Sequence, residues 1–198
     1  MRKVYFIRHG EYDSNYTELP GRLPVPLSDL GREQARRFKD YFIDKEVEKI
    51  YSSPVVRCKQ TAAVISDSNL LIEFDVRLAD TLTAYQGYWG KNYEGKENHF
   101  FKHVNDLGGE TLEDVQKRMM NFYEDKILDT DGDIVVCSHS DPIMTLRCGV
   151  EKTALPKAKV RRSKGLKLEL GAVLTLNWDD EGEKQFDETV SLLDENND

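Results

Sequence analysis

Cysteine and long apolar runs are both scarce in this sequence. The three cysteines, Cys58, Cys137 and Cys148, are an odd number at scattered positions, without the paired spacing of a zinc site or a disulfide framework. No apolar run approaches the roughly 20 residues that span a bilayer. The apolar stretch after Arg2 and Lys3 lacks the cleavage site of a signal peptide. We therefore expect reduced, buried thiols, no metal site, and a cytoplasmic protein without a membrane partner.

Positive charge is also in deficit. The chain has 28 Lys and Arg residues against 36 Asp and Glu residues, which gives a formal net charge of -8 at pH 7. A polyanion is repelled by such a protein, so we expect no nucleic-acid partner. One basic run, KAKVRRSKGLK at 157–167, departs from this average. It is either a solvated loop or a guide for anionic ligands.

Short β-rich segments alternate with amphipathic ones along the chain. Strands are predicted at 3–7, 48–53, 71–75, 133–138 and 171–178, and helices at 28–42, 55–66, 111–127 and 142–150. Ser28 is a favourable N-cap, and Thr111 with Asp114 resembles a capping box. The alternation predicts an α/β fold, a three-layer sandwich with a mainly parallel sheet flanked by helices. We expect one domain over 1–198, with an irregular lid at 83–109 and an acidic C-terminal segment, 179–198, that begins as a turn.

Three predicted strands lead into residues that bind anions. Arg8 and His9 end the first strand, His139 follows strand 133–138, and Arg57 stands shortly after strand 48–53. Ligands of an open parallel sheet bind at the carboxyl ends of its strands, so we expect these side chains to converge, with Asn15 beside them. Arginine forks match phosphate oxygens bidentately. The pattern favours a phosphoryl group as the ligand.

Five ordered blocks of residues resemble one known family. Arg8-His9-Gly10, with Asn15 seven residues after the arginine, is similar to the signature of the histidine phosphatase superfamily, in its phosphoglycerate mutase-like branch. The other blocks are Gly21 with Pro26-Leu27-Ser28-Asp29-Leu30-Gly31, Tyr51-Ser52-Ser53-Pro54 with Arg57 and Gln60-Thr61-Ala62, Gly108-Gly109-Glu110-Thr111, and Ser138-His139. The resemblance implies a phosphoglycerate mutase-like fold from residue 3 to residue 178.

The resemblance also implies a role for each site residue. His9 is the nucleophile that becomes phosphohistidine, and it must be neutral, with its other ring nitrogen donating to a carbonyl near the following glycine. The phosphate is surrounded by Arg8, Asn15, Arg57 and His139, which supply the positive charge, so no metal is implied. Gly10 would let the main chain turn closely beneath the phosphate.

The family's acid, which protonates the leaving oxygen, is usually a glutamate. Asp80 stands at the corresponding position, in Arg77-Leu78-Ala79-Asp80, although its side chain is one methylene shorter. Glu94, in Tyr93-Glu94-Gly95, is the alternative acid. We predict that Asp80 is the acid and keep Glu94 as the alternative.

The lid gives the best indication of the reaction. Phosphoglycerate mutases of the family carry an adjacent arginine pair in this region, whereas residues 91–106 contain lysines and no arginine. The favoured function is therefore hydrolysis of a small phosphomonoester without a cofactor. The first alternative is a phosphoglycerate mutase, an isomerase that uses 2,3-bisphosphoglycerate, and the second is a non-catalytic phosphate-binding module. The physiological substrate and the oligomeric state stay open.

Overall fold

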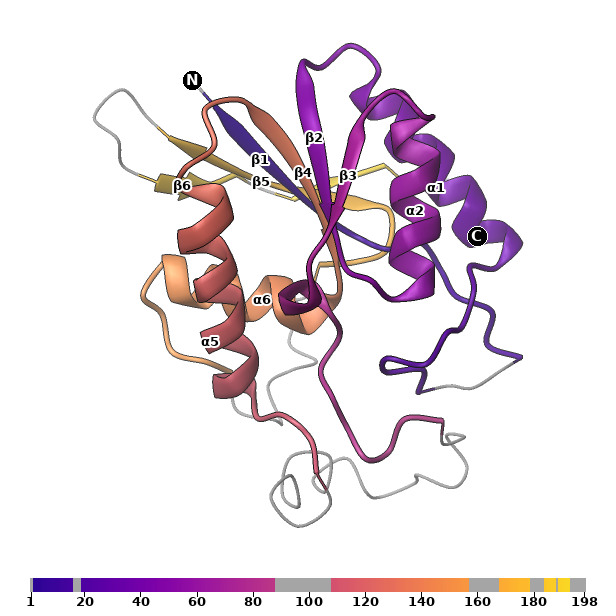
Figure 1. Ribbon diagram of the computed structural model, residues 1–198, viewed down its shortest axis with the longest axis vertical. Coiled ribbons are helices and arrows are strands. Elements are labelled where there is room, and N and C mark those ends of the chain that lie inside the picture. The colour runs from indigo at the N-terminus through magenta and orange to yellow at the C-terminus, as the bar shows by residue number, and fades with distance from the viewer. Residues whose placement is uncertain are drawn as a thin grey trace.

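The structure is a computed structural model that describes residues 2–15, 19–87, 108–156, 168–178, 184–187 and 189–192. A seven-stranded sheet lies at its centre, in the order β3-β2-β4-β1-β5-β6, with β7 also paired to β5 (Figure 1). The strands are β1 (Lys3–Arg8), β2 (Val47–Ser52), β3 (Leu71–Phe74), β4 (Asp133–Ser138), β5 (Ala172–Trp178), β6 (Lys184–Phe186) and β7 (Val190–Ser191). Strands β3, β2, β4 and β1 are parallel, and β5 is antiparallel to β1.

Helices cover both faces of the sheet, as predicted (Figure 1). One face carries α1 (Asp29–Phe42) and α2 (Val56–Ser66), and the other carries α5 (Leu112–Phe122) and α6 (Ser140–Val150). A short 3-10 helix, η1 (Val76–Leu78), follows β3, and α5 continues into a π-helical turn, η3 (Tyr123–Ile127). None of the helices in the described part of the chain is long and apolar enough to cross a membrane.

The central strands are apolar on both sides because both of their faces are covered. In β1, Val4 and Phe6 belong to the core under α5 and α6, whereas Tyr5 and Ile7 belong to the core under α1 and α2. All four are almost completely buried. The alternation of side chains along β1 therefore anchors this strand in two cores at once.

The helix caps predicted from the sequence are confirmed. The Ser28 side chain accepts a hydrogen bond from the N–H of Gly31 at the start of α1. Thr111 and Asp114 form a reciprocal capping box at the start of α5. The five predicted strands and four predicted helices are all present, within a few residues of their expected ends.

The end of the chain differs from the prediction. We expected a turn-like stretch at 179–185, but Lys184 and Gln185 belong to β6, and a further short strand, β7, follows. Both strands pair with β5 and are short, largely polar and at the margin of the sheet, so they carry no alternating apolar pattern. The basic run 157–167 and residues 88–107 of the lid lie outside the described residues.

Gly10 and Gly31 let the segment after β1 lie directly against the first turn of α1. A Cβ atom at Gly10 would lie 2.3 Å from the Gly31 carbonyl oxygen, and one at Gly31 would lie 2.0 Å from the carbonyl oxygen of Glu11. Gly10 is not among the residues with a positive φ. Close packing of two main chains therefore excludes a side chain at Gly10, and its predicted role beneath a phosphate stays a prediction.

Replacing Gly31 with alanine is expected to lower the free energy of unfolding by about 2–3 kcal/mol, because the added methyl group meets main-chain atoms that cannot move aside. Gly149→Ala in α6 is the matched control, since its methyl group would meet the flexible end of the Met120 side chain. Urea unfolding followed by circular dichroism measures both variants. Equal stabilities of the two would contradict this account of Gly31.

Candidate active site

The register of the sheet brings two histidines together. Arg8 of β1 lies opposite Ser138 of β4, and the N–H of His9 donates to the Ser138 carbonyl oxygen at 3.2 Å. His9 and His139 therefore leave neighbouring strands at the same end of the sheet, and their ring centroids are 5.0 Å apart. Their exposed fractions are only 2% and 1%. The predicted convergence of these two residues is confirmed.

Arg57, in the first turn of α2, forms hydrogen bonds to the other residues of the cluster. It is completely buried. Its Nε donates to His9 Nε2 at 2.9 Å, and its Nη2 lies within hydrogen-bond distance of three acceptors. These are the Gly21 carbonyl oxygen at 2.8 Å, Asp80 Oδ2 at 2.8 Å and His139 Nδ1 at 3.0 Å. One guanidinium thus contacts both histidines and a carboxylate.

The contacts of His9 determine its tautomer. Its Nδ1 lies 2.7 Å from the Gly10 carbonyl oxygen, which only accepts, so Nδ1 carries the proton. Nε2 accepts from Arg57, so it carries no proton, and its lone pair is engaged in this hydrogen bond. Burial, followed by the charges of Arg57 and Arg8, holds the pKa of His9 well below its ordinary value. The ring is a neutral imidazole with an unprotonated Nε2, which is the form that a nucleophile requires.

His139 is neutral for the same reasons but has the opposite tautomer. Burial and the Arg57 charge are the largest causes that hold its pKa well below the ordinary value. Its Nδ1 faces the donating Nη2 of Arg57, so the proton is on Nε2. This N–H donates to Ser53 Oγ at 2.9 Å, and Ser53 Oγ in turn accepts the N–H of Val55 at 3.3 Å. Ser53 therefore orients His139.

Asp80 lies at the edge of this cluster, just after η1. Its Oδ2 is 2.8 Å from Arg57 Nη2 and 3.7 Å from His139 Nδ1, and its Oδ1 accepts the N–H of Thr81 at 2.9 Å. The side chain is 24% exposed, whereas those of Arg57 and His139 are almost fully buried. Asp80 is therefore the cluster's carboxylate with access to a molecule that arrives from solvent. The alternative acid, Glu94, lies outside the described residues.

Two guanidinium nitrogens of the site are buried without a partner among the described residues. They are Arg8 Nε and Arg57 Nη1. Burial lowers the pKa of Arg8, although the charge of Asp80 opposes this shift. A buried donor without an acceptor is costly, and a phosphate group has oxygens that accept from several donors at once. The chemistry of the site fits a phosphate ligand.

The structure does not bring Asn15 into the cluster. Asn15 is exposed, in a turn in which its N–H donates to Asp13 Oδ1 at 2.9 Å. The following residues, 16–18, lie outside the described part of the chain. A role for Asn15 at the phosphate stays a prediction.

Several residues of the site received no role from the sequence. Ser53 and Thr61 lie in a block that was quoted for its resemblance, and Thr61 links the two sides of the site. Thr61 Oγ1 accepts the N–H of Gly10 at 3.2 Å and donates to the Arg57 carbonyl oxygen at 2.9 Å.

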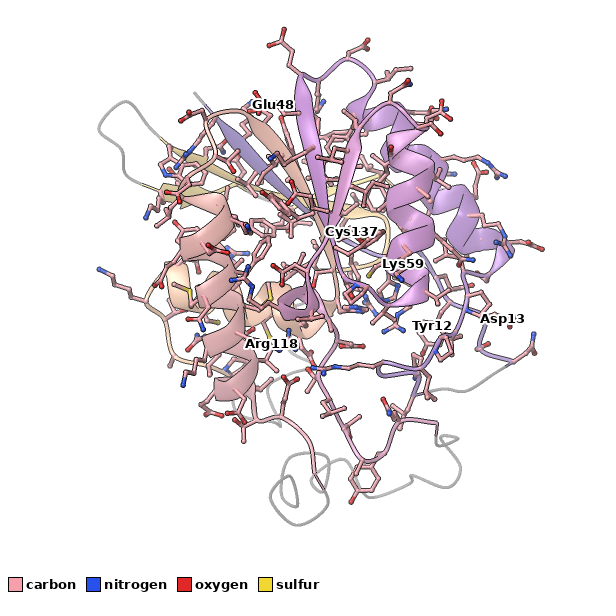
Figure 2. All side chains as sticks on the ribbon, viewed as in Figure 1. Tyr12, Asp13, Glu48, Lys59, Arg118 and Cys137 are labelled. Atoms are coloured by element: carbon pink, nitrogen blue, oxygen red, sulfur yellow. The ribbon has the colours of Figure 1, made fainter. Side chains whose placement is uncertain are left out.

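Arg22 and Arg118 both donate hydrogen bonds to the Asp80 carbonyl oxygen, and no sequence signal singles these two arginines out. In Figure 2, Arg118 on α5 and Tyr12 after β1 lie on either side of this end of the sheet.

No metal site was found among the residues that the structure describes. Within those ranges, no three His, Cys, Asp or Glu side chains come close enough together to hold an ion. The three cysteines are all buried and free. The positive charge near His9 is supplied by guanidinium groups.

Comparisons with known proteins agree with this geometry. The model of the histidine phosphatase superfamily (branch 1) matches residues 4–187. A Hydrogenobacter thermophilus protein named "Putative phosphoserine phosphatase 2" is 29% identical over 160 residues, which cover 75% of this chain and 78% of that protein. The 2,3-bisphosphoglycerate-dependent phosphoglycerate mutase of Thermoplasma acidophilum is 29% identical over 193 residues, which cover 89% and 92%.

The solved structure of Bacillus stearothermophilus YhfR is similar to this one along most of both chains. The TM-score is 0.79 at 22% identity, and the match covers 93% of this chain and 95% of that one. At this level of identity the likeness concerns the fold alone. The fold class predicted from the sequence is confirmed.

Mild acid is expected to destabilise the protein through His9 and His139. In the unfolded chain both titrate near the ordinary histidine pKa of about 6.5, whereas in the folded protein their pKa values lie well below it. The unfolded state then binds more protons, so the free energy of unfolding falls as the pH drops below about 6.5, by up to about 1.4 kcal/mol per pH unit for each histidine.

Urea unfolding at a series of pH values measures this slope. His139→Gln, which removes one of the two groups, should reduce the slope between about pH 6.5 and pH 5 by up to half, while the slope near pH 8 should be the same in both proteins. A variant with the same slope as the native protein would contradict the neutral state of His139.

Proposed function

This chain belongs to the histidine phosphatase superfamily, and we propose that it hydrolyses small phosphomonoesters through a phosphohistidine on His9. The observation that carries the proposal is the state of that residue. His9 is buried and neutral, with Nε2 unprotonated and with the guanidiniums of Arg8 and Arg57 beside it. Such an arrangement accepts a phosphate group and presents a nucleophile to its phosphorus atom.

Two transfers make up the proposed reaction. In the first, His9 Nε2 forms a bond to phosphorus while the bond to the ester oxygen breaks, and the leaving oxygen takes a proton from the carboxyl group of Asp80. In the second, a water molecule attacks the phosphohistidine, His9 leaves, and Asp80 takes a proton from that water. Arg8 and Arg57 stabilise the charge on the equatorial phosphate oxygens in both steps.

Arg57 couples substrate binding to the release of the nucleophile. Without substrate, its Nε donates to His9 Nε2, the nitrogen that must attack phosphorus. A phosphate group offers charged oxygens, which are stronger acceptors than an imidazole nitrogen. We infer that the guanidinium turns to the phosphate as it binds, and that His9 Nε2 then has its lone pair free. Nδ1 keeps its bond to Gly10, so the ring stays in place.

Hydrolysis is favoured over mutase activity by the sequence of the lid. Residues 91–106 contain no arginine, and single lysines recognise a substrate carboxylate with less geometric precision than an arginine fork. The named relatives include both a phosphoserine phosphatase and a phosphoglycerate mutase. A mutase remains the second candidate, and it would require 2,3-bisphosphoglycerate to keep His9 phosphorylated.

The first test is ³¹P NMR of the protein with 3-phosphoglycerate, catalytic 2,3-bisphosphoglycerate and EDTA, and, separately, with phosphoserine and EDTA. We expect inorganic phosphate to appear from at least one of the two esters, and we expect no 2-phosphoglycerate. His9→Ala should show no turnover. Formation of 2-phosphoglycerate ahead of phosphate would establish the mutase instead. Dependence on an added metal ion would contradict the mechanism.

The acid role of Asp80 is tested by the leaving group. Asp80→Asn should lower kcat/KM, which reports the first transfer to His9, by about 10²–10⁴-fold for an alkyl phosphate and by less than about tenfold for p-nitrophenyl phosphate, because nitrophenolate leaves without a proton. Asp125→Asn is the matched control, since Asp125 also pairs with an arginine, Arg77, but away from the site. Equal losses on both substrates would remove the assignment, and a selective loss in Glu94→Gln would transfer it to Glu94.

A further inference from the structure

The main chain at Asp80 itself is held by side chains. Asp80 follows η1 outside the named strands and helices, and main-chain pairing resumes only at Leu82, whose carbonyl oxygen accepts the N–H of Glu110 at 2.9 Å, and at Thr83, which forms a bridge with Gly109. The Asp80 carbonyl oxygen accepts from Arg22 Nε at 2.8 Å and from Arg118 Nη2 at 3.3 Å. Two guanidiniums, from distant parts of the chain, therefore meet at this one oxygen atom.

The preceding residues are held in the same way. Arg118 Nη1 donates to the carbonyl oxygen of Arg77. Ser138 Oγ donates to the carbonyl oxygen of Leu78 at 2.8 Å. Side chains of α5 and β4 thus fix the path from η1 to Asp80, and Figure 2 shows Arg118 on α5 beside that path.

Glu110 joins the two arginines to each other. Its carboxylate accepts from Arg22 Nη2 at 2.7 Å, and from Arg118 Nε at 2.8 Å and Nη2 at 3.1 Å. It also accepts the N–H of Leu82 at 2.9 Å, two residues after Asp80. The Glu110 carboxylate therefore fixes the chain on the far side of Asp80, while Arg22 and Arg118 hold Asp80 itself.

Charge and burial make this arrangement rigid. The side chains of Glu110 and Arg118 are 17% and 15% exposed, and that of Arg22 is 31% exposed. Burial by itself would raise the pKa of Glu110, but hydrogen bonds from Arg118 and the Leu82 N–H, with the charges of Arg118 and Arg22, hold it below the ordinary value. Glu110 is thus ionised at neutral pH. A half-buried ionic network is a weak source of net stability, but it fixes geometry well.

We propose that Arg22, Glu110 and Arg118 are positioning residues, which set the place of the Asp80 carboxyl group by holding its main chain. The inference rests on the proposed function, because Asp80 acts as the acid there. Its physical basis is that the carboxylate's own arginine partner, Arg57, turns to the phosphate during the reaction. From then on the Asp80 carboxyl group keeps its hydrogen bond from the Thr81 N–H, and the contacts to Arg22 and Arg118 hold the main chain that carries it.

The test uses Arg22→Lys and Glu110→Gln, two variants of similar size to the native residues. A lysine retains the charge but lacks the fork that reaches the Asp80 carbonyl and Glu110 together. We expect kcat/KM, which reports the first transfer to His9, to fall by about 10–100-fold for an alkyl phosphate in each variant, with little change in kcat/KM for p-nitrophenyl phosphate. Arg147→Lys is the matched control, because Arg147 forms a comparable arginine–glutamate pair with Glu151 on α6.

Coupling to Asp80 separates positioning from general damage. In an Asp80→Asn background, Arg22→Lys and Glu110→Gln should cause no further change in the ratio of kcat/KM for the alkyl ester to kcat/KM for the aryl ester. A further fall of that ratio, or equal losses on both substrates in the single variants, would overturn the inference. Thermal unfolding of each variant shows whether a general loss reflects unfolding.

The outcomes also separate this inference from the proposed function. Native protein that is active, together with variants whose substrate ratio is unchanged, would overturn the inference and leave the function standing. Native protein that hydrolyses neither substrate would overturn both. Substrate-selective losses in Arg22→Lys and Glu110→Gln, absent in Arg147→Lys, would establish the positioning role.

Discussion

The completely buried guanidinium of Arg57 is the constraint on which the site depends. Removing a charged group from water costs several kcal/mol unless acceptors replace the water. The fold supplies them from different parts of the chain: His9 after β1, Gly21 in the following loop, Asp80 after η1, and His139 after β4. Because the Arg57 guanidinium needs hydrogen-bond acceptors, the predicted nucleophile His9, the predicted acid Asp80 and the second histidine, His139, all lie around this one group.

The same guanidinium determines the protonation of its neighbours. Each histidine offers Arg57 an unprotonated nitrogen, and each has its proton directed the other way, toward Gly10 or Ser53. Because the positive charge is already present, protonating either ring would place a second positive charge in a buried volume. The neutral state of His9 is thus a consequence of its burial beside Arg57, and the attack proposed for His9 needs no separate base.

The sequence predicts the parts of this arrangement that local patterns encode. The apolar β1 and β4 and the caps of α1 and α5 are visible in the chain, and the topology then makes His9 and His139 neighbours. The sequence indicates a role for Gly10 beneath a phosphate, but it does not reveal that Gly31, 21 residues away, also excludes a side chain there. Contacts of this kind depend on tertiary packing. The network of Arg22, Glu110 and Arg118 likewise joins residues up to 96 positions apart, and no spacing rule reveals it.

The proposed acid, Asp80, gives a physical reason for such a network. In the family resemblance this position is usually a glutamate, and Asp80 is one methylene shorter. A shorter side chain has fewer rotatable bonds and a shorter reach, so the main chain must bring the carboxyl group to its place. In this protein the main chain is held at the Asp80 carbonyl oxygen by two guanidiniums that share one carboxylate. A longer glutamate side chain could place its carboxyl group by adjusting its own torsion angles. For Asp80, the position of the carboxyl group depends on where the main chain is held.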